Sequence, residues 1–132
     1  MARRPEPRPV YLDTHIVAWL HDGLVERLSP DARAAIEEGL LLISSIVELE
    51  LTYLHEIGRF RPTAAKALGV LARDIGLQRS EIPLRDSVRE AIKLSWTRDP
   101  FDRLIVGEAL AAGAALLTRD ELILANCRAA LW

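Results

Sequence analysis

Four acidic residues have the types and positions to do chemistry together: Asp13, Glu50, Asp102 and Asp120. Each falls near the expected end of a strand or start of a helix. A buried carboxylate without a partner is costly, and several held close together cannot all stay ionised without a cation. Oxygen ligands suit Mg²⁺ or Mn²⁺ better than Zn²⁺, and such ions activate water and stabilise in-line displacement at phosphorus. The four acids therefore indicate a divalent-metal site that acts on phosphate esters.

The helix expected over residues 45–57 carries two glutamates, Glu48 and Glu50. They lie about 200° apart around the helix axis, so they face opposite ways. Glu50 has mainly apolar neighbours one turn away, whereas Glu48 lies nearer a polar side. A glutamate at the margin of an apolar stripe can also extend its long side chain to solvent. The pattern alone leaves a metal-binding and a structural role for Glu50 open.

Asp99, Asp102 and Asp120 each have an ordinary structural explanation. In the segment RDPFDR, Asp99 suits the N-cap of a helix, Pro100 the first helical position and Asp102 the third. Asp120, after LLTR, fits a turn or an N-cap. Capping and metal binding are compatible, because a helix N-terminus also holds carboxylates in place. The acids therefore carry more weight as a set than one by one.

Short apolar runs alternate with helical patterns along the chain, which favours an α/β fold with a mostly parallel sheet. The expected strands are 10–13, 40–44, 77–82, 114–118 and a final edge strand within 128–132. The expected helices are 14–21, 30–39, 45–57, 61–76, 84–94, 99–113 and 120–124. Ligands of open parallel sheets bind beyond the carboxyl ends of the strands. Asp13 and Asp120 follow two such ends and can therefore converge.

Length and composition fit one globular domain over residues 10–132, after a disordered lead-in over residues 1–9. The single cysteine, Cys127, excludes an internal disulfide framework and fits a reducing compartment, so we expect a cytoplasmic protein. No apolar run reaches the roughly 18 residues that span a bilayer, so no membrane is expected as a partner. The sequence contains no HExxH, P-loop or GxGxxG motif.

Four short motifs in order resemble the PIN-domain nucleases, particularly the VapC-type toxin ribonucleases of toxin–antitoxin pairs. They are YLDTHIVAWL, ISSIVELEL, RDPFDRLIVGEAL and LLTRDE, and the likeness covers nearly the whole chain from residue 10 to 132. The resemblance implies a PIN-like three-layer sandwich, with a central mostly parallel sheet flanked by helices. It also implies endonucleolytic cleavage of RNA with Mg²⁺ or Mn²⁺.

Matched motif by motif, the resemblance implies that the catalytic and metal-binding acids are Asp13, Glu50, Asp102 and Asp120. In the second motif the acid lies six residues after the first serine, which selects Glu50 over Glu48. Supporting positions carried over in the same way are Thr14, Asp99 and Thr118, whereas the role of His15 is open.

RNA must approach an acidic pocket through basic flanks. Arg103 and Arg119 adjoin acids in the sequence and are the candidates for phosphate contacts, although either can instead pair with a carboxylate. By resemblance, the helical pair within residues 45–75 would bind an antitoxin peptide, and the protein would form a homodimer.

Two other readings compete with a nuclease. A haloacid-type aspartyl phosphatase usually has a second aspartate two residues after the first, and here that position is His15. A non-catalytic α/β interaction domain on a PIN-like scaffold is the alternative that stays open. Such a scaffold would be expected to have lost one or more of the four acids, and all four are present.

Overall fold

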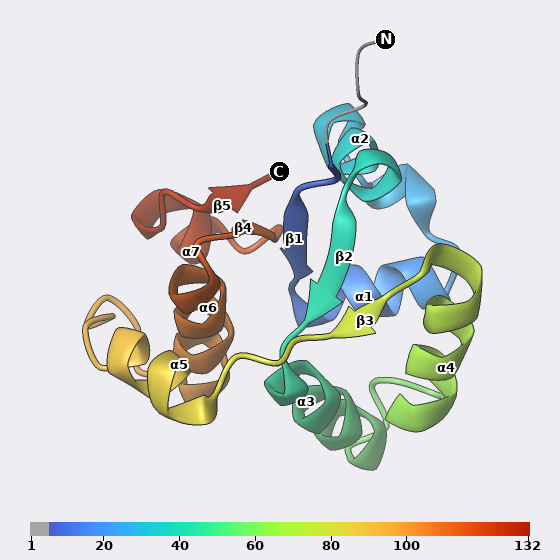
Figure 1. The fold of residues 1–132 in the computed structure, drawn as a ribbon. Coiled ribbons are helices and arrows are strands. Elements are labelled where there is room, and N and C mark those ends of the chain that lie inside the picture. Colours follow the sequence, from blue (N-terminus) through green and yellow to red (C-terminus); the bar gives the residue numbers. More distant parts are fainter. Residues whose placement is uncertain (1–5) are drawn as a thin grey trace, which may run out of the picture.

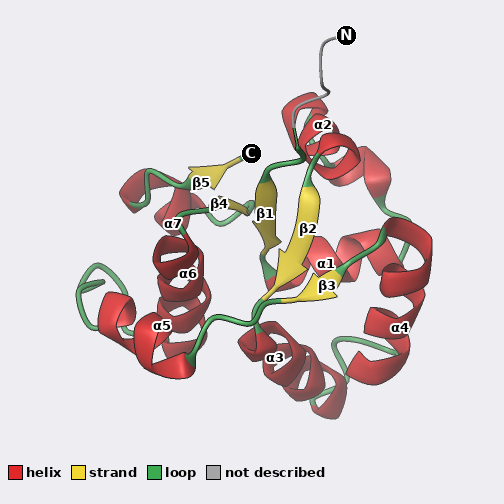
Figure 2. Ribbon diagram, in the orientation of Figure 1, coloured by secondary structure: helices red, strands yellow, loops and turns green. Residues whose placement is uncertain are grey.

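The computed structural model describes residues 6–132, which form a five-stranded sheet between two layers of helices (Figures 1 and 2). Every strand pairing is parallel, and the strand order is β3-β2-β1-β4-β5. The predicted α/β sandwich with a mostly parallel central sheet is therefore confirmed. The strands are β1 (Pro9–Leu12), β2 (Leu40–Ile43), β3 (Gln78–Arg79), β4 (Ala115–Leu117) and β5 (Ala130–Leu131). The helices are α1 (Thr14–His21), α2 (Pro30–Glu38), α3 (Ser45–Glu56), α4 (Ala64–Ile75), α5 (Leu84–Ala91), α6 (Pro100–Ala112) and α7 (Glu121–Asn126), with a 3₁₀ turn at Val25–Arg27.

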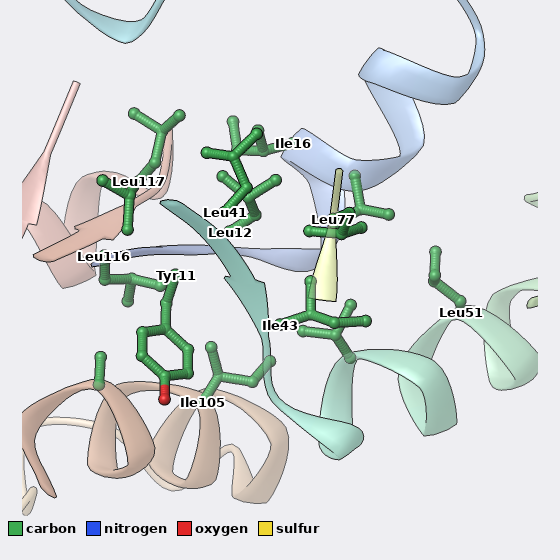
Figure 3. Packing of buried hydrophobic residues seen from close by; sticks show 14 of the residues in the cluster. Tyr11, Leu12, Ile16, Leu41, Ile43, Leu51, Leu77, Ile105, Leu116 and Leu117 are labelled. Atoms are coloured by element: carbon green, nitrogen blue, oxygen red, sulfur yellow. The ribbon is translucent and has the colours of Figure 1, made fainter. Parts of the chain in front are cut away.

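Alternate residues of the central strands point to opposite faces of the sheet, and each face is covered by its own helices (Figure 3). Leu12 and Leu117 face the side of α1, where Ile16 is completely buried. Tyr11 and Leu116 face the other side, where Ile105 of α6 packs. Both faces are apolar, as expected for a parallel sheet covered on both sides.

Local capping explains why the helices begin where they do. Ser29 caps α2 by accepting a hydrogen bond from the Ala32 amide, and Pro30 occupies the first turn, as predicted. The helix expected from residue 61 begins only at Ala64, because the Thr63 side chain caps it by accepting from the Lys66 amide.

The strand expected over residues 77–82 is shorter in the structure. β3 contains only Gln78 and Arg79, which pair with the end of β2 at the edge of the sheet. The amide of Ser80 adds one further bond to the Ile43 carbonyl before the chain turns away toward Pro83. The edge strand expected within residues 128–132 is present as β5, parallel to β4.

The expected lead-in over residues 1–9 is only partly covered, because residues 1–5 lie outside the described part. Pro9 already belongs to β1, so the first strand begins and ends one residue earlier than predicted. Among residues 6–132, no helix is long and apolar enough to cross a membrane.

Gly107 of α6 allows this helix to approach α5 closely. A Cβ atom at this position would lie 2.6 Å from the Ser87 carbonyl oxygen and 3.0 Å from the Ala91 amide nitrogen. Backbone atoms cannot move aside as a flexible side chain does. Gly69 of α4 is a matched contrast, because a Cβ there would meet no atom within 4 Å.

We expect Gly107→Ala to lower the free energy of unfolding by about 1–3 kcal/mol, because the added methyl forces two packed helices apart. Gly69→Ala should raise it by about 0.5–1 kcal/mol, through the better helix propensity of alanine alone. Urea unfolding followed by circular dichroism measures both changes. Equal effects of the two substitutions would show that the α5–α6 contact is not constrained at Gly107.

Candidate active site at the carboxyl edge of the sheet

Asp13 lies directly after β1, with only 5% of its surface exposed. Its Oδ1 accepts a hydrogen bond from the Thr14 amide at 2.8 Å and so caps α1. Its Oδ2 accepts from the Thr118 hydroxyl at 2.6 Å. Burial raises the pKa of Asp13, while these two hydrogen bonds and His15 act in the opposite direction. The first acid is therefore held by the first residue of α1 and by the residue that follows β4.

Thr118 joins the first acid to the fourth. It follows β4, is completely buried, and its Oγ1 accepts a hydrogen bond from the Asp120 amide at 3.0 Å while donating to Asp13. Asp120 in turn caps α7, because its Oδ1 accepts from the Ile123 amide at 3.0 Å. Thr118 and Asp120 thus adjoin Asp13 at one edge, and Asp120 also has the N-cap role that the sequence allowed.

Asp102, in the first turn of α6, is a strongly perturbed acid of the site. Burial and the negative charges of Asp99, Asp13, Asp120 and Glu50, in that order, raise its pKa to about 7. Four separate segments of the chain must therefore place their carboxylates within electrostatic reach of one point. Titratable groups shifted in this way are concentrated at functional sites.

Glu50 of α3 reaches this site, whereas Glu48 does not. The pKa of Glu50 is raised overall, mainly by burial and further by the charges of Asp13 and Asp99. Thr14 and His15 act in the opposite direction and offset part of this rise. The Glu48 carboxylate instead forms a bidentate ion pair on the surface with the Arg79 guanidinium, with nitrogen–oxygen distances of 2.8 and 3.1 Å.

Asp99 serves the site through the helix that carries Asp102. Its Oδ1 accepts hydrogen bonds from the amides of Phe101 and Asp102, at 2.8 and 3.2 Å, and so caps α6. The capping role considered for Asp99 is therefore what the geometry shows. Its charge also contributes to raising the pKa of Asp102.

The donor set fits a hard divalent cation. The Thr14 hydroxyl oxygen lies beside Glu50, is fully enclosed and makes no hydrogen bond of good geometry within residues 6–132. An orphaned oxygen among repelling carboxylates is suited to an ion or to the water around it. Within residues 6–132, no group of three or more aspartate, glutamate, histidine or cysteine side chains is placed so that all could hold one metal ion. Mg²⁺ commonly keeps several waters and takes one or two carboxylates directly, so the two findings are compatible.

The two arginines predicted to contact phosphate lie in different surroundings. Arg103 is half-buried, and its Nε donates to the Leu94 carbonyl at 3.1 Å, which ties α6 to the loop before it. Arg119 is exposed, and its guanidinium lies 5.4 Å from the centre of the Trp132 ring. Neither arginine pairs with a carboxylate among the described residues.

Sequence reasoning missed Glu108, a buried carboxylic acid on α6. Its Oε1 accepts from the hydroxyls of Ser44 and Ser87, at 3.1 and 3.4 Å, and its Oε2 is buried without a partner in residues 6–132. Burial raises the pKa of Glu108. Ser44 also caps α3, so Glu108 connects the helix of Asp102 to the helix of Glu50. A single charged residue inside the apolar run LIVGEAL was the available signal.

Burial of Asp102 and its repulsion by the neighbouring acids predict that removal of its charge stabilises the fold. Because the pKa of Asp102 is about 7 when folded and near 3.9 when unfolded, the folded state binds its proton more tightly. Its ionised form therefore destabilises the fold, and stability falls as pH rises from about 4 through 7. With EDTA at pH 8, Asp102→Asn should raise the melting temperature by roughly 2–4 °C, allowing for solvent screening. The gain should vanish near pH 4.

Differential scanning fluorimetry across pH measures this change. Asp31→Asn is the matched control, because Asp31 is exposed in the first turn of α2 and should give no gain. A melting temperature of Asp102→Asn at or below that of the unsubstituted chain at pH 8 would contradict the repulsion.

Comparison with solved structures identifies chains of the same fold at low sequence identity. VapBC2 from Rickettsia felis, bound to a DNA fragment from their promoter, matches with a TM-score of 0.64 and 18% identity over 89% of this chain and 92% of the other. A toxin–antitoxin complex from Klebsiella pneumoniae matches with a TM-score of 0.63 and 17% identity, over 93% of this chain and 96% of the other. VapBC-1 from nontypeable Haemophilus influenzae matches with a TM-score of 0.54 and 18% identity, over 85% of this chain and 87% of the other.

No curated protein matches the sequence significantly. The family model of the PIN domain, however, matches residues 10–127, a span that contains all four acids. The parallel sheet, the acids at its carboxyl edge and this match agree, and the chain belongs to the PIN-domain family.

Proposed function

We propose that this chain is a divalent-metal-dependent endoribonuclease and the toxin of a toxin–antitoxin pair, acting in the cytoplasm, with residues 10–132 as its single domain. The observation that carries the proposal is that hydrogen bonds and helix caps hold Asp13, Asp102 and Asp120 at one edge of the sheet, where burial and the neighbouring acids raise the pKa of Asp102. Membership of a family whose members are generally nucleases supports it. So does the likeness in fold to structures described as VapBC or toxin–antitoxin complexes.

In this proposal Asp13, Glu50, Asp102 and Asp120 hold Mg²⁺ or Mn²⁺. The bound ion would supply Lewis acidity and a water that is readily deprotonated at neutral pH. Thr118 keeps Asp13 in one orientation, and the Asp99 cap keeps the first turn of α6, with Asp102, in place. Burial raises the pKa of Glu50, which is the direction expected for a carboxylate that takes part in proton transfer.

RNA would approach the acids past Arg119, which is exposed and lies next to Asp120. We propose phosphate contacts for both Arg119 and Arg103. Because the Arg103 guanidinium already donates to the Leu94 carbonyl, we expect the larger share from Arg119.

The nuclease proposal is tested by cleavage of labelled single-stranded RNA with Mg²⁺, with Mn²⁺ and with EDTA. We expect cutting only with metal, and a loss of at least about 100-fold in Asp13→Asn/Asp102→Asn, as for other charge-stabilising groups. Glu50→Gln should also lose activity, whereas Glu48→Gln, on the same helix but paired with Arg79, should keep it.

A second readout is independent of activity. Mn²⁺ should raise the melting temperature of the unsubstituted chain but not that of the Asp13→Asn/Asp102→Asn variant. Neither cleavage nor a metal-dependent shift would refute the nuclease and favour a non-catalytic interaction domain.

Two exposed apolar stripes support the proposed partners. On α3, Leu49, Tyr53 and Ile57 are 57%, 50% and 46% exposed at four-residue spacing. On the other helix, a groove of about 350 Å³ lies between α4 and β3 and is lined by residues that include Leu68, Ala72 and Gln78. We assign the α3–α4 side to the antitoxin peptide.

The second stripe lies on α5 and consists of Leu84, Val88 and Ile92. Apolar side chains repeated along one exposed helix face fit a symmetric contact between two copies. We assign this α5 stripe to the homodimer.

Light scattering after size exclusion should therefore give about twice the 14.7 kDa of one chain. Val88→Glu/Ile92→Glu should give a monomer, because burying two charges in an apolar contact is costly. Leu122→Glu, on α7, replaces an exposed leucine outside both stripes and should remain dimeric. If both variants remain dimeric, the dimer interface does not lie on α5.

A further inference from the structure

The carboxyl edge of the sheet continues beyond the acids to Trp132. The amide of Asp13 donates to the Leu117 carbonyl at 3.0 Å, and the amide of Thr118 donates to the Leu131 carbonyl at 3.1 Å. Asp13, Thr118 and Trp132 are thus at the same level on three adjacent strands. Neighbouring strands are about 4.8 Å apart, so Trp132 lies roughly 10 Å across the edge from Asp13.

Trp132 belongs to a row of alternating aromatic and cationic side chains. Its ring meets the Trp19 ring of α1 edge to face, with centres 6.1 Å apart and planes at 68°. The Arg119 guanidinium lies 5.4 Å from the Trp132 ring centre, and the Arg27 guanidinium lies 5.7 Å from that of Trp19. We call Arg119, Trp132, Trp19 and Arg27 the Trp–Arg row.

The row is accessible and its charges are not neutralised by ion pairs. Both tryptophans are partly exposed and both arginines are exposed. Neither Arg27 nor Arg119 takes part in any salt bridge between described residues. Packing against the hydrophobic core explains why one side of each tryptophan is buried. It does not explain why an arginine without an ion-pair partner lies over each ring.

This chemistry matches that of a single nucleic-acid strand. Bases of any sequence stack on tryptophan, and guanidinium groups bind phosphate oxygens in pairs. An exposed cation–π contact is weaker than a base–aromatic stack. An incoming base can therefore replace an arginine on the ring and free that guanidinium for the adjoining phosphate.

We propose that the Trp–Arg row binds single-stranded RNA, with bases stacked on Trp132 and Trp19 beside the phosphate presented to the acids. The proposal rests on the proposed ribonuclease function and adds where the strand lies: from Asp13 across Thr118 toward Trp132. It also assigns Arg119 and Arg27 to phosphates on that side of the cleaved bond.

The test measures binding separately from cleavage. The full chain carrying Asp102→Asn is titrated in EDTA against a short fluorescein-labelled single-stranded RNA of mixed sequence, and anisotropy gives the Kd. Trp132→Leu in this background should weaken binding about 5- to 100-fold, the range found for one base–aromatic stack. Trp132→Phe should keep most of the affinity, because it retains an aromatic face.

The arginines are tested by charge. Arg119→Gln and Arg27→Gln should each weaken binding and reduce the salt slope of log K by about 0.7, the value for one contact to a single strand. Arg128→Gln is the matched control. Arg128 is exposed before β5, at the opposite edge of the sheet, and its loss should leave both quantities nearly unchanged.

The outcomes separate this proposal from the nuclease itself. Equal affinity in the Trp132→Leu, Arg119→Gln and Arg128→Gln variants, or no RNA binding at all, would refute the Trp–Arg row even if the unsubstituted chain cuts RNA. Row-dependent binding by a chain that shows neither metal-dependent cutting nor a Mn²⁺-dependent rise in melting temperature would support the row and refute the nuclease. Circular dichroism and melting temperature confirm that each variant is folded.

Discussion

The buried carboxylate of Asp13 is the constraint on which the carboxyl edge of this sheet depends. Its oxygens are bonded to the Thr14 amide and the Thr118 hydroxyl, so β1, α1 and the end of β4 are fixed to one another through one side chain. Without those donors, the burial of Asp13 would cost several times a typical net hydrogen bond. Its charge acts on Asp102 and Glu50, so the hydrogen bonds that make its burial tolerable also hold it within electrostatic reach of other acids.

Helix capping is the second device that assembles the acids. Asp13, Asp99 and Asp120 each cap a helix, and Asp102 lies in a first turn. A cap satisfies amide groups at a helix start, which also tolerate negative charge. Each carboxylate is thereby restrained locally at small cost, whereas their mutual repulsion is left uncompensated in the protein alone. In the proposed function, a divalent cation would relieve that repulsion.

Behind the site, a second polar group fixes the helices that carry the acids. Glu108 joins α6 to the first turn of α3 through Ser44, and it reaches α5 through Ser87. Close contact of α5 and α6 at Gly107 belongs to the same arrangement. Beside the site, the strand order that brings Thr118 to Asp13 also brings Trp132 to Thr118. Acids, hydroxyl and aromatic ring therefore share one edge as a consequence of register.

The sequence by itself determined the α/β class and the order of strands and helices, because hydrophobic periodicity and capping residues are local signals. It also indicated four candidate acids, of which Glu50 was selected over Glu48 by the family resemblance. The Gly and Pro signals located most helix ends. The length of β3 was overestimated, because only Gln78 and Arg79 align with the last residues of β2 before the chain turns away. Only the tertiary structure decided that Glu50 faces the site while Glu48 pairs with Arg79, that Arg103 turns toward Leu94, and that Glu108 is buried. Those outcomes depend on contacts between segments far apart in the chain, and no local pattern encodes such distances.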